Sequence, residues 1–223
     1  MKIQKLLAEI CVYCVGLFIL ALGVAFAINS DLGISPVSSW AIAVHLVSGI
    51  GAGFSMTLFF IGCILFQIVL LRKAFKWVNL TQIVFSFLFG FFVDAAIWIV
   101  GDFGIPTYIG QLVMLSISMI LIAIGLSVYL EAKLVSLPSE GVILAIIQKY
   151  PKFSFHRVKI IMDCLLVAMA MGTTLIFMGG IYGVREGTVI AAVAIGKIIP
   201  FVRKIVVSIL GKLQFYRTVG ELG

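Results

Sequence analysis

Charged residues are scarce in this chain, and their scarcity argues against a soluble fold. Asp, Glu, Lys and Arg make up 11% of the 223 residues, whereas 63% are hydrophobic; a soluble domain carries about 25% charged residues. Uncharged runs such as 54–71 and 83–93 do not alternate in polarity, so they predict membrane helices rather than barrel strands. We expect an all-α polytopic membrane protein with lipid as a partner.

Cysteine and catalytic motifs are also scarce. The four cysteines all lie in apolar runs, where packing is a better interpretation than a disulfide or a zinc site. The sequence has no His-Glu-x-x-His motif, no phosphate-binding glycine loop followed by Lys-Ser/Thr, and no Ser-His-Asp set at one depth. We therefore expect no enzymatic activity, no metal and no cofactor.

The formal net charge of +7 does not favour nucleic-acid binding, because the basic residues are spread over the two ends and the loops 72–76 and 149–159. Such clusters mark the cytoplasmic side of membrane proteins. Two short apolar segments, 37–48 and 139–149, have about a dozen residues each, too few to cross a hydrocarbon core of about 30 Å. If both are re-entrant, every basic cluster and both termini face the cytoplasm. The remaining apolar segments predict six spans, at 7–28, 54–71, 82–100, 108–131, 157–178 and 187–208.

The two halves of the chain match at a constant offset. Gly23 corresponds to Gly125, Leu32 to Leu134, and Pro36 to Pro138. Each half contains a long span, a short helix broken at its start, and two more spans. Because three crossings is an odd number, the second half must be inverted relative to the first. We predict a single membrane domain made of two inverted repeats, residues 1–104 and 105–223, with three spans and one re-entrant helix in each.

Three glycine-based motifs carry a family resemblance. They are Gly33-Ile34-Ser35-Pro36-Val37-Ser38-Ser39, Gly49-Ile50-Gly51-Ala52-Gly53, and Gly187-Thr188-Val189-Ile190 leading to Ile195-Gly196-Lys197. With them the chain resembles the YczE/YyaS/YitT-type group of bacterial integral membrane proteins. The resemblance implies the fold and a bacterial cytoplasmic membrane more than it implies a substrate.

The breaks at Pro36 and Pro138 are the predicted binding site. A proline suits the first position of a helix, and helix N-termini expose unpaired N–H groups and a partial positive charge that suit an anionic group. For the serines here the alternative is capping, and for the glutamate it is interaction with the helix dipole. The candidate substrate-binding residues are Ser35, Ser38, Ser39, Trp40, Ser139 and Glu140.

Four ionisable residues are candidates for charge coupling. Asp94, Asp163 and Lys197 lie within predicted spans, where an uncompensated charge costs at least about 2.5–3.5 kcal/mol. Lys197 is the expected counter-ion of the aspartates, and a purely structural ion pair is the alternative. His45, near the end of the first short helix, is either a proton carrier or a packing residue.

These features favour a secondary transporter that holds a small polar or anionic metabolite between the two broken-helix N-termini. One alternative is an ion or small-solute channel that uses the same helix ends for selectivity. Another is a membrane scaffold or accessory subunit that binds a partner protein or lipid. The glycine-containing span around Gly90 also leaves a homodimer open.

Overall fold

The computed structural model describes residues 2–50 and 52–212, and its described part is helical without strands. The predicted all-α class is therefore confirmed, while residues 1, 51 and 213–223 of the two predicted repeats lie outside the described residues. Two 3-10 turns, Arg72–Ala74 and Trp77–Thr81, connect the third and fourth helices. The eight α-helices among the described residues are α1 (Lys2–Asn29), α2 (Pro36–Ser48), α3 (Ala52–Leu71), α4 (Gln82–Val100), α5 (Tyr108–Glu131), α6 (Pro138–Lys149), α7 (Phe155–Met178) and α8 (Glu186–Lys212).

Five of these helices are long and apolar enough to cross a membrane. They are α1, α3, α4, α5 and α7. α8 has 27 residues but is not among the five, because it carries Glu186, Lys197, Arg203 and Lys204 within the predicted sixth span or at its ends. The described structure thus supports a multi-pass membrane protein. Five of its described helices are long and apolar enough to be membrane spans, one fewer than the six predicted.

The two short helices begin as their prolines predict. Pro36 and Pro138 each occupy a first-turn position, and the residues before them, Ser35 and Leu137, are extended with ψ angles of 135° and 154°. Proline favours this arrangement because its ring disfavours a helical conformation in the preceding residue. Neither preceding side chain caps its helix, so some backbone N–H groups at both helix starts are left to other partners.

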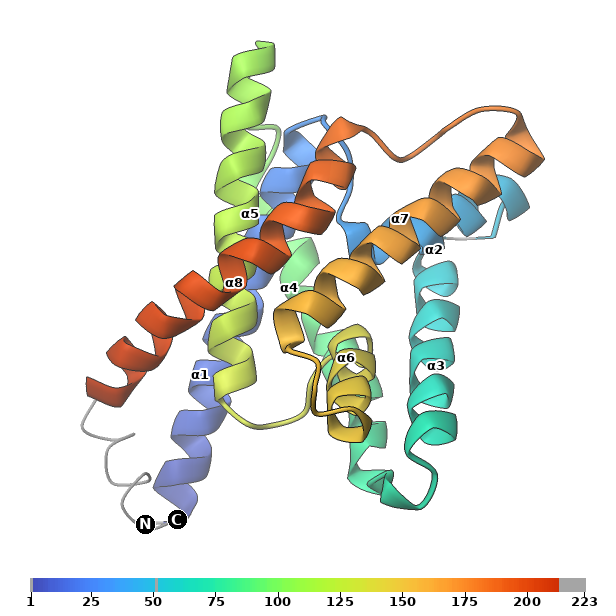
Figure 1. Cartoon of the computed structure of the whole chain (residues 1–223). Coiled ribbons are helices and arrows are strands. Elements are labelled where there is room, and N and C mark those ends of the chain that lie inside the picture. Colours follow the sequence, from blue (N-terminus) through green and yellow to red (C-terminus); the bar gives the residue numbers. More distant parts are fainter. Residues whose placement is uncertain (1, 51, 213–223) are drawn as a thin grey trace.

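α1 and α5 lie side by side and pack closely at glycines (Figure 1). A Cβ atom on Gly125 of α5 would lie 2.4 Å from the backbone N of Leu20 and 2.8 Å from the carbonyl O of Gly16 on α1. A Cβ atom on Gly23 of α1 would meet Ile122 and Ser118 of α5 in the same way. As the residue number rises on one helix it falls on the other, so the two helices are antiparallel.

The other helices pack around this pair in a nearly regular pattern. α4 packs on α1 and α8 on α5, while α2 packs on α7 and α3 on α6. One pair departs from the pattern: α7 lies along α8, whereas α3 and α4 are not packed along each other. Figure 1 shows α3 at the right edge of the bundle and α4 near its middle. Residues of both α3 and α4 line the cavity described below.

Replacing Gly125 by valine is expected to destabilise the α1–α5 contact, since the added side chain would meet the α1 backbone. Overpacking of this kind costs about 1–3 kcal/mol. The thermal unfolding midpoint of the purified protein in detergent should therefore fall. Gly172→Val is the matched control, because a Cβ atom on Gly172 in α7 meets nothing within 4 Å. Equal midpoints for the two variants would contradict the described contact.

Candidate functional site

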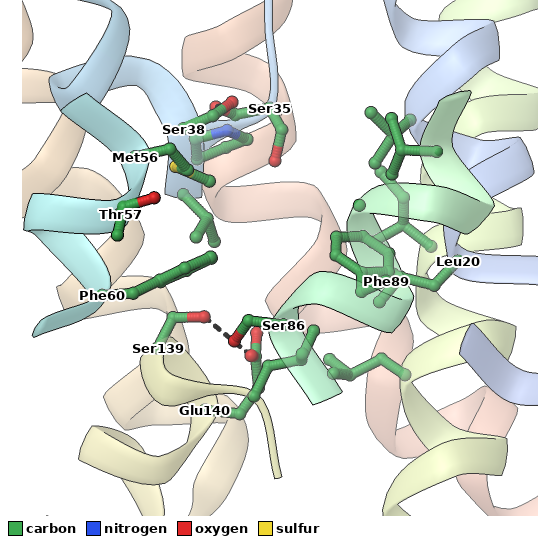
Figure 2. Close-up of a pocket in the computed structure, with 18 of the residues that line it drawn as sticks. Leu20, Ser35, Ser38, Met56, Thr57, Phe60, Ser86, Phe89, Ser139 and Glu140 are labelled. Atoms are coloured by element: carbon green, nitrogen blue, oxygen red, sulfur yellow. Dashed lines mark hydrogen bonds between the residues drawn. The ribbon is translucent and has the colours of Figure 1, made fainter. Parts of the chain in front are cut away.

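A cavity of about 610 Å³ lies where the N-terminal ends of α2 and α6 approach each other. Figure 2 shows Ser35 and Ser38 of α2 at one end and Ser139 and Glu140 of α6 at the other. The walls between these ends are largely apolar. They include Leu20 of α1, Met56 and Phe60 of α3, Phe89 of α4, Ile122 and Leu126 of α5, and Ile195 of α8.

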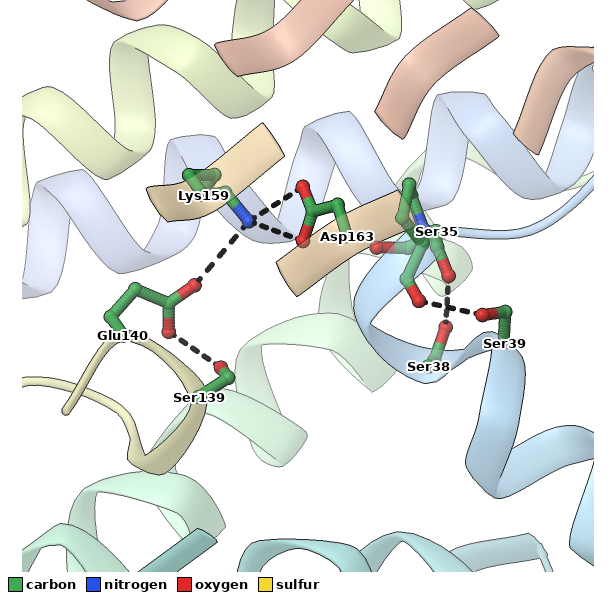
Figure 3. A network of polar contacts seen from close by, with 8 residues as sticks. Ser35, Ser38, Ser39, Ser139, Glu140, Lys159 and Asp163 are labelled. Carbon is green, nitrogen blue, oxygen red and sulfur yellow. Dashed lines mark hydrogen bonds and ion pairs between the residues drawn. The ribbon is translucent and has the colours of Figure 1, made fainter. Parts of the chain in front are cut away.

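Three charged side chains form a compact cluster in the cavity wall (Figure 3). Lys159 Nζ lies 3.0 Å from Asp163 Oδ1, to which it donates a hydrogen bond, and 3.0 Å from Asp163 Oδ2. The same ammonium lies 3.9 Å from Glu140 Oε1, and Ser139 Oγ donates a hydrogen bond of 2.7 Å to Glu140 Oε2. The three charged residues are only 1–5% exposed: Asp163 1%, Lys159 3% and Glu140 5%.

Local sequence explains how the cluster forms. Lys159 and Asp163 are four residues apart near the start of α7, so their side chains share one face of that helix. Glu140 is in the first turn of α6, where the helix dipole stabilises a carboxylate. Two carboxylates share one ammonium, and Asp163 Oδ2, although close to Nζ, has no hydrogen-bond partner in the described residues. Asp163 Oδ2 is therefore held near Lys159 by charge attraction without a hydrogen bond from any described residue.

The predicted pairing of the aspartates with Lys197 is wrong. Asp163 pairs with Lys159, and Lys197 is exposed on α8. The i, i+4 spacing of Lys159 and Asp163 is the sequence signal for this pair. From the sequence Lys159 is expected in the basic loop 149–159, whereas the structure places it inside α7. Asp94 lines the cavity and is exposed, with no hydrogen bond or ion pair to any described residue.

The predicted residues of α2 divide according to helix face. Ser35 and Ser38 line the cavity, and Ser38 Oγ donates to Ser35 O at 3.0 Å. Ser39 is buried outside the cavity lining, with its hydroxyl donating to Pro36 O. The indole of Trp40 packs against Phe59 instead, with ring centroids 6.2 Å apart.

His45 is also not at the cavity. Its Nδ1 lies 2.6 Å from Ile50 O beyond the C-terminal end of α2, so the imidazole contacts the connection to α3. The structure therefore gives His45 a local contact at the far end of the helix, away from the charged cluster.

Comparison with known proteins places the chain in a family. The model of DUF6198, a family of unknown function, matches residues 7–204. The chain belongs to this family. It is 28% identical to the uncharacterized membrane protein YczE of Bacillus subtilis (strain 168) over 199 residues, covering 89% of this chain and 86% of YczE. It is 26% identical to the uncharacterized protein YyaS of the same strain over 135 residues, covering 60% of this chain and 66% of YyaS.

These matches confirm the resemblance that the glycine motifs indicated. Together with the five apolar helices, they support a membrane protein whose outer side chains contact lipid. No solved structure matches the chain.

A buried pair of glutamine side chains at the α6 end of the cavity is absent from the sequence predictions. Gln67 of α3 and Gln82 of α4 exchange two side-chain hydrogen bonds of 3.1 Å, and Gln67 Nε2 also donates to Pro138 O at 3.1 Å. Both glutamines line a second cavity, which has a volume of about 400 Å³. The pair therefore bridges α3 to α4 beside the start of α6. Two glutamines in apolar runs were the only sequence signal.

Replacing Lys159 by methionine is expected to destabilise the protein, because it leaves Asp163 and Glu140 buried without their cation. Breaking a buried pair in this way typically costs about 3–5 kcal/mol. The double variant Lys159→Met/Asp163→Leu should recover part of the loss, since it removes both partners of the closer pair and leaves Glu140 as the one carboxylate without its cation. Thermal unfolding in detergent measures both effects. A double variant no more stable than Lys159→Met would contradict the pairing.

Proposed function

We propose that this protein is a secondary transporter that moves a small solute through the cavity between the N-terminal ends of α2 and α6. The observation that carries the proposal is the buried Glu140–Lys159–Asp163 cluster in the wall of that cavity. Charged groups buried in a membrane protein are costly, and they are usually part of a substrate, ion or proton pathway. The proposal includes no enzymatic step, metal or cofactor.

The packing of α1 and α5 supports an inverted repeat. Gly23 contacts Ile122, and Gly125 contacts Leu20; the sequence offset that relates Gly23 to Gly125 also relates Leu20 to Ile122. The offset therefore converts the Gly23–Ile122 contact into the Gly125–Leu20 contact. Such a reciprocal pair of contacts is characteristic of two-fold symmetry. Because the helices are antiparallel, the proposed axis lies in the membrane plane, and the halves have opposite topologies.

The proposed topology has six spans, with α8 as the sixth and α2 and α6 as re-entrant helices. The three basic residues in the last ten positions of α8, Arg203, Lys204 and Lys212, are consistent with a cytoplasmic end. Arg203 lies 3.5 Å from Glu131 at the end of α5. This arrangement keeps the basic clusters and both termini in the cytoplasm of a bacterial cytoplasmic membrane. The two helix starts then approach the cavity from opposite sides.

The charges that line the cavity favour a cation over the anion that the sequence suggested. Three carboxyl groups, from Asp94, Glu140 and Asp163, accompany one ammonium, from Lys159. The α6 N-terminus could otherwise attract an anion, but Glu140 of the same helix already lies in its first turn. Ser35, Ser38 and Ser139 supply hydroxyl groups for hydrogen bonds to the solute.

Glu140 is the proposed coupling group. It lies 3.9 Å from the ammonium, whereas Asp163 lies at 3.0 Å, so Glu140 is the carboxylate that gives up Lys159 more readily. A proton or cationic solute bound at Glu140 replaces this attraction. The α6 tip can then move relative to α7, and exposure of the cavity changes from one side to the other.

Proteoliposomes on a solid-supported membrane test the proposal. Choline, tetraphenylphosphonium, succinate, phosphate and glucose are applied in turn, and the transient current is recorded over a range of pH. We expect a saturable, pH-dependent current with at least one organic cation. Glu140→Gln should abolish it, because the amide cannot carry the coupling charge.

Glu131→Gln is the matched control, since Glu131 undergoes the same change at the end of α5, outside the cavity lining. It should keep the current. A steady current without saturation or pH dependence would favour the channel. The absence of any Glu140-dependent current would overturn transport and favour the scaffold.

A further inference from the structure

We infer that the cargo is an organic cation with an apolar body, and that it reaches the cavity from the lipid through the gap between α3 and α4. The inference rests on the proposed transport function and adds a substrate class and a route of access. Its first support is the asymmetry of the bundle. α7 lies along α8, but α3 and α4 diverge, and they are joined beside the start of α6 by Gln67 and Gln82.

Side chains at this gap belong both to the cavity wall and to the outer surface. Ile61 of α3 and Phe87 and Phe91 of α4 line the cavity and are 42%, 70% and 67% exposed. Phe87 and Phe91 continue an exposed stripe on α4 that includes Val84 and Trp98, spaced for one helix face. An exposed apolar stripe on a membrane helix faces lipid. The mouth of the cavity therefore opens toward the hydrocarbon.

The interior of the cavity fits the same class of molecule. Its volume of about 610 Å³ lies within the roughly 300–1,000 Å³ typical of pockets for drug-sized ligands. Figure 2 shows Phe60 and Met56 facing Phe89 and Leu20 across the cavity, so aromatic and aliphatic surfaces are available to an apolar body. Aromatic faces also attract organic cations.

The carboxylates that line the cavity favour an apolar molecule with a positive charge over one that is neutral or negative. Asp94 has no partner among the described residues and lines the cavity from α4, the helix that also supplies Phe87 and Phe91 to the mouth. Glu140 lies deeper, at the start of α6, with the Lys159–Asp163 pair beside it. A cation that enters between α3 and α4 thus finds one free carboxylate on α4 and a second carboxylate at the far end.

Binding to the full chain in lipid nanodiscs tests the inference, with radiolabelled tetraphenylphosphonium as the probe and empty nanodiscs as the lipid background. Tetraphenylborate has the same shape and the opposite charge. We expect saturable binding of tetraphenylphosphonium and no saturable binding of radiolabelled tetraphenylborate, which is measured in separate samples because the two ions form an insoluble salt together. Asp94→Asn should weaken this binding about tenfold, the effect of roughly 1.4 kcal/mol.

Gly90→Phe tests the route. Gly90 lines the cavity from α4, and a Cβ atom there meets nothing within 4 Å, so the phenyl group fills space rather than displacing backbone. It should weaken tetraphenylphosphonium binding by about tenfold or more. Gly172→Phe on α7 is the matched control, since Gly172 is equally open and does not line the cavity. Elution of both variants as single monodisperse peaks establishes that they fold.

The outcomes separate this inference from the transport proposal. Equal binding of tetraphenylphosphonium by the two phenylalanine variants, or equal affinity for tetraphenylborate, would overturn the inference. A Glu140-dependent choline current without tetraphenylphosphonium binding would also overturn it and leave transport standing. Binding that Gly90→Phe weakens, without a Glu140-dependent current for any solute, would support the site and overturn transport.

Discussion

The sharing of the Lys159 ammonium between Asp163 and Glu140 is the interaction on which the rest of the site depends. It joins the first turn of a short helix, α6, to the first turns of a long one, α7. A buried ion pair adds little stability over well-packed apolar side chains, yet loss of one partner is costly. For this reason the cluster is the basis of the proposed transport function.

The surrounding fold holds this cluster beside a cavity. Antiparallel contact of α1 and α5 at Gly16, Gly23 and Gly125 brings the two halves together, and each half contributes one short helix whose start borders the cavity. The halves differ where α3 and α4 diverge while α7 and α8 stay packed. Under the proposed inverted repeat, one open pair and one closed pair are what we expect of a transporter whose two states exchange the roles of the halves.

Much of the fold was predictable from the sequence, because the length of an apolar run and the position of a proline largely determine where a helix begins and ends. The short helices expected at 37–48 and 139–149 are observed at Pro36–Ser48 and Pro138–Lys149. The site was predictable only in part. Adjacent residues of a helix point about 100° apart, so sequence could not decide whether Ser38 or Ser39 faces the cavity. The i, i+4 pair of Lys159 and Asp163 is visible in the sequence. The approach of Glu140 to Lys159 and the separation of α3 from α4 depend on tertiary packing between similarly apolar helices.

If one cavity joins the starts of α2 and α6 and opens to each side in turn, a cysteine at either start must be reachable from both sides of the membrane. Side-specific labelling of single cysteines measures this. Ser35→Cys and Ser139→Cys are placed separately in a chain without its four native cysteines, and a membrane-impermeant maleimide is applied to right-side-out and inside-out vesicles. We expect each cysteine to be labelled from both sides. Labelling of each from one side only, or of neither, would contradict it.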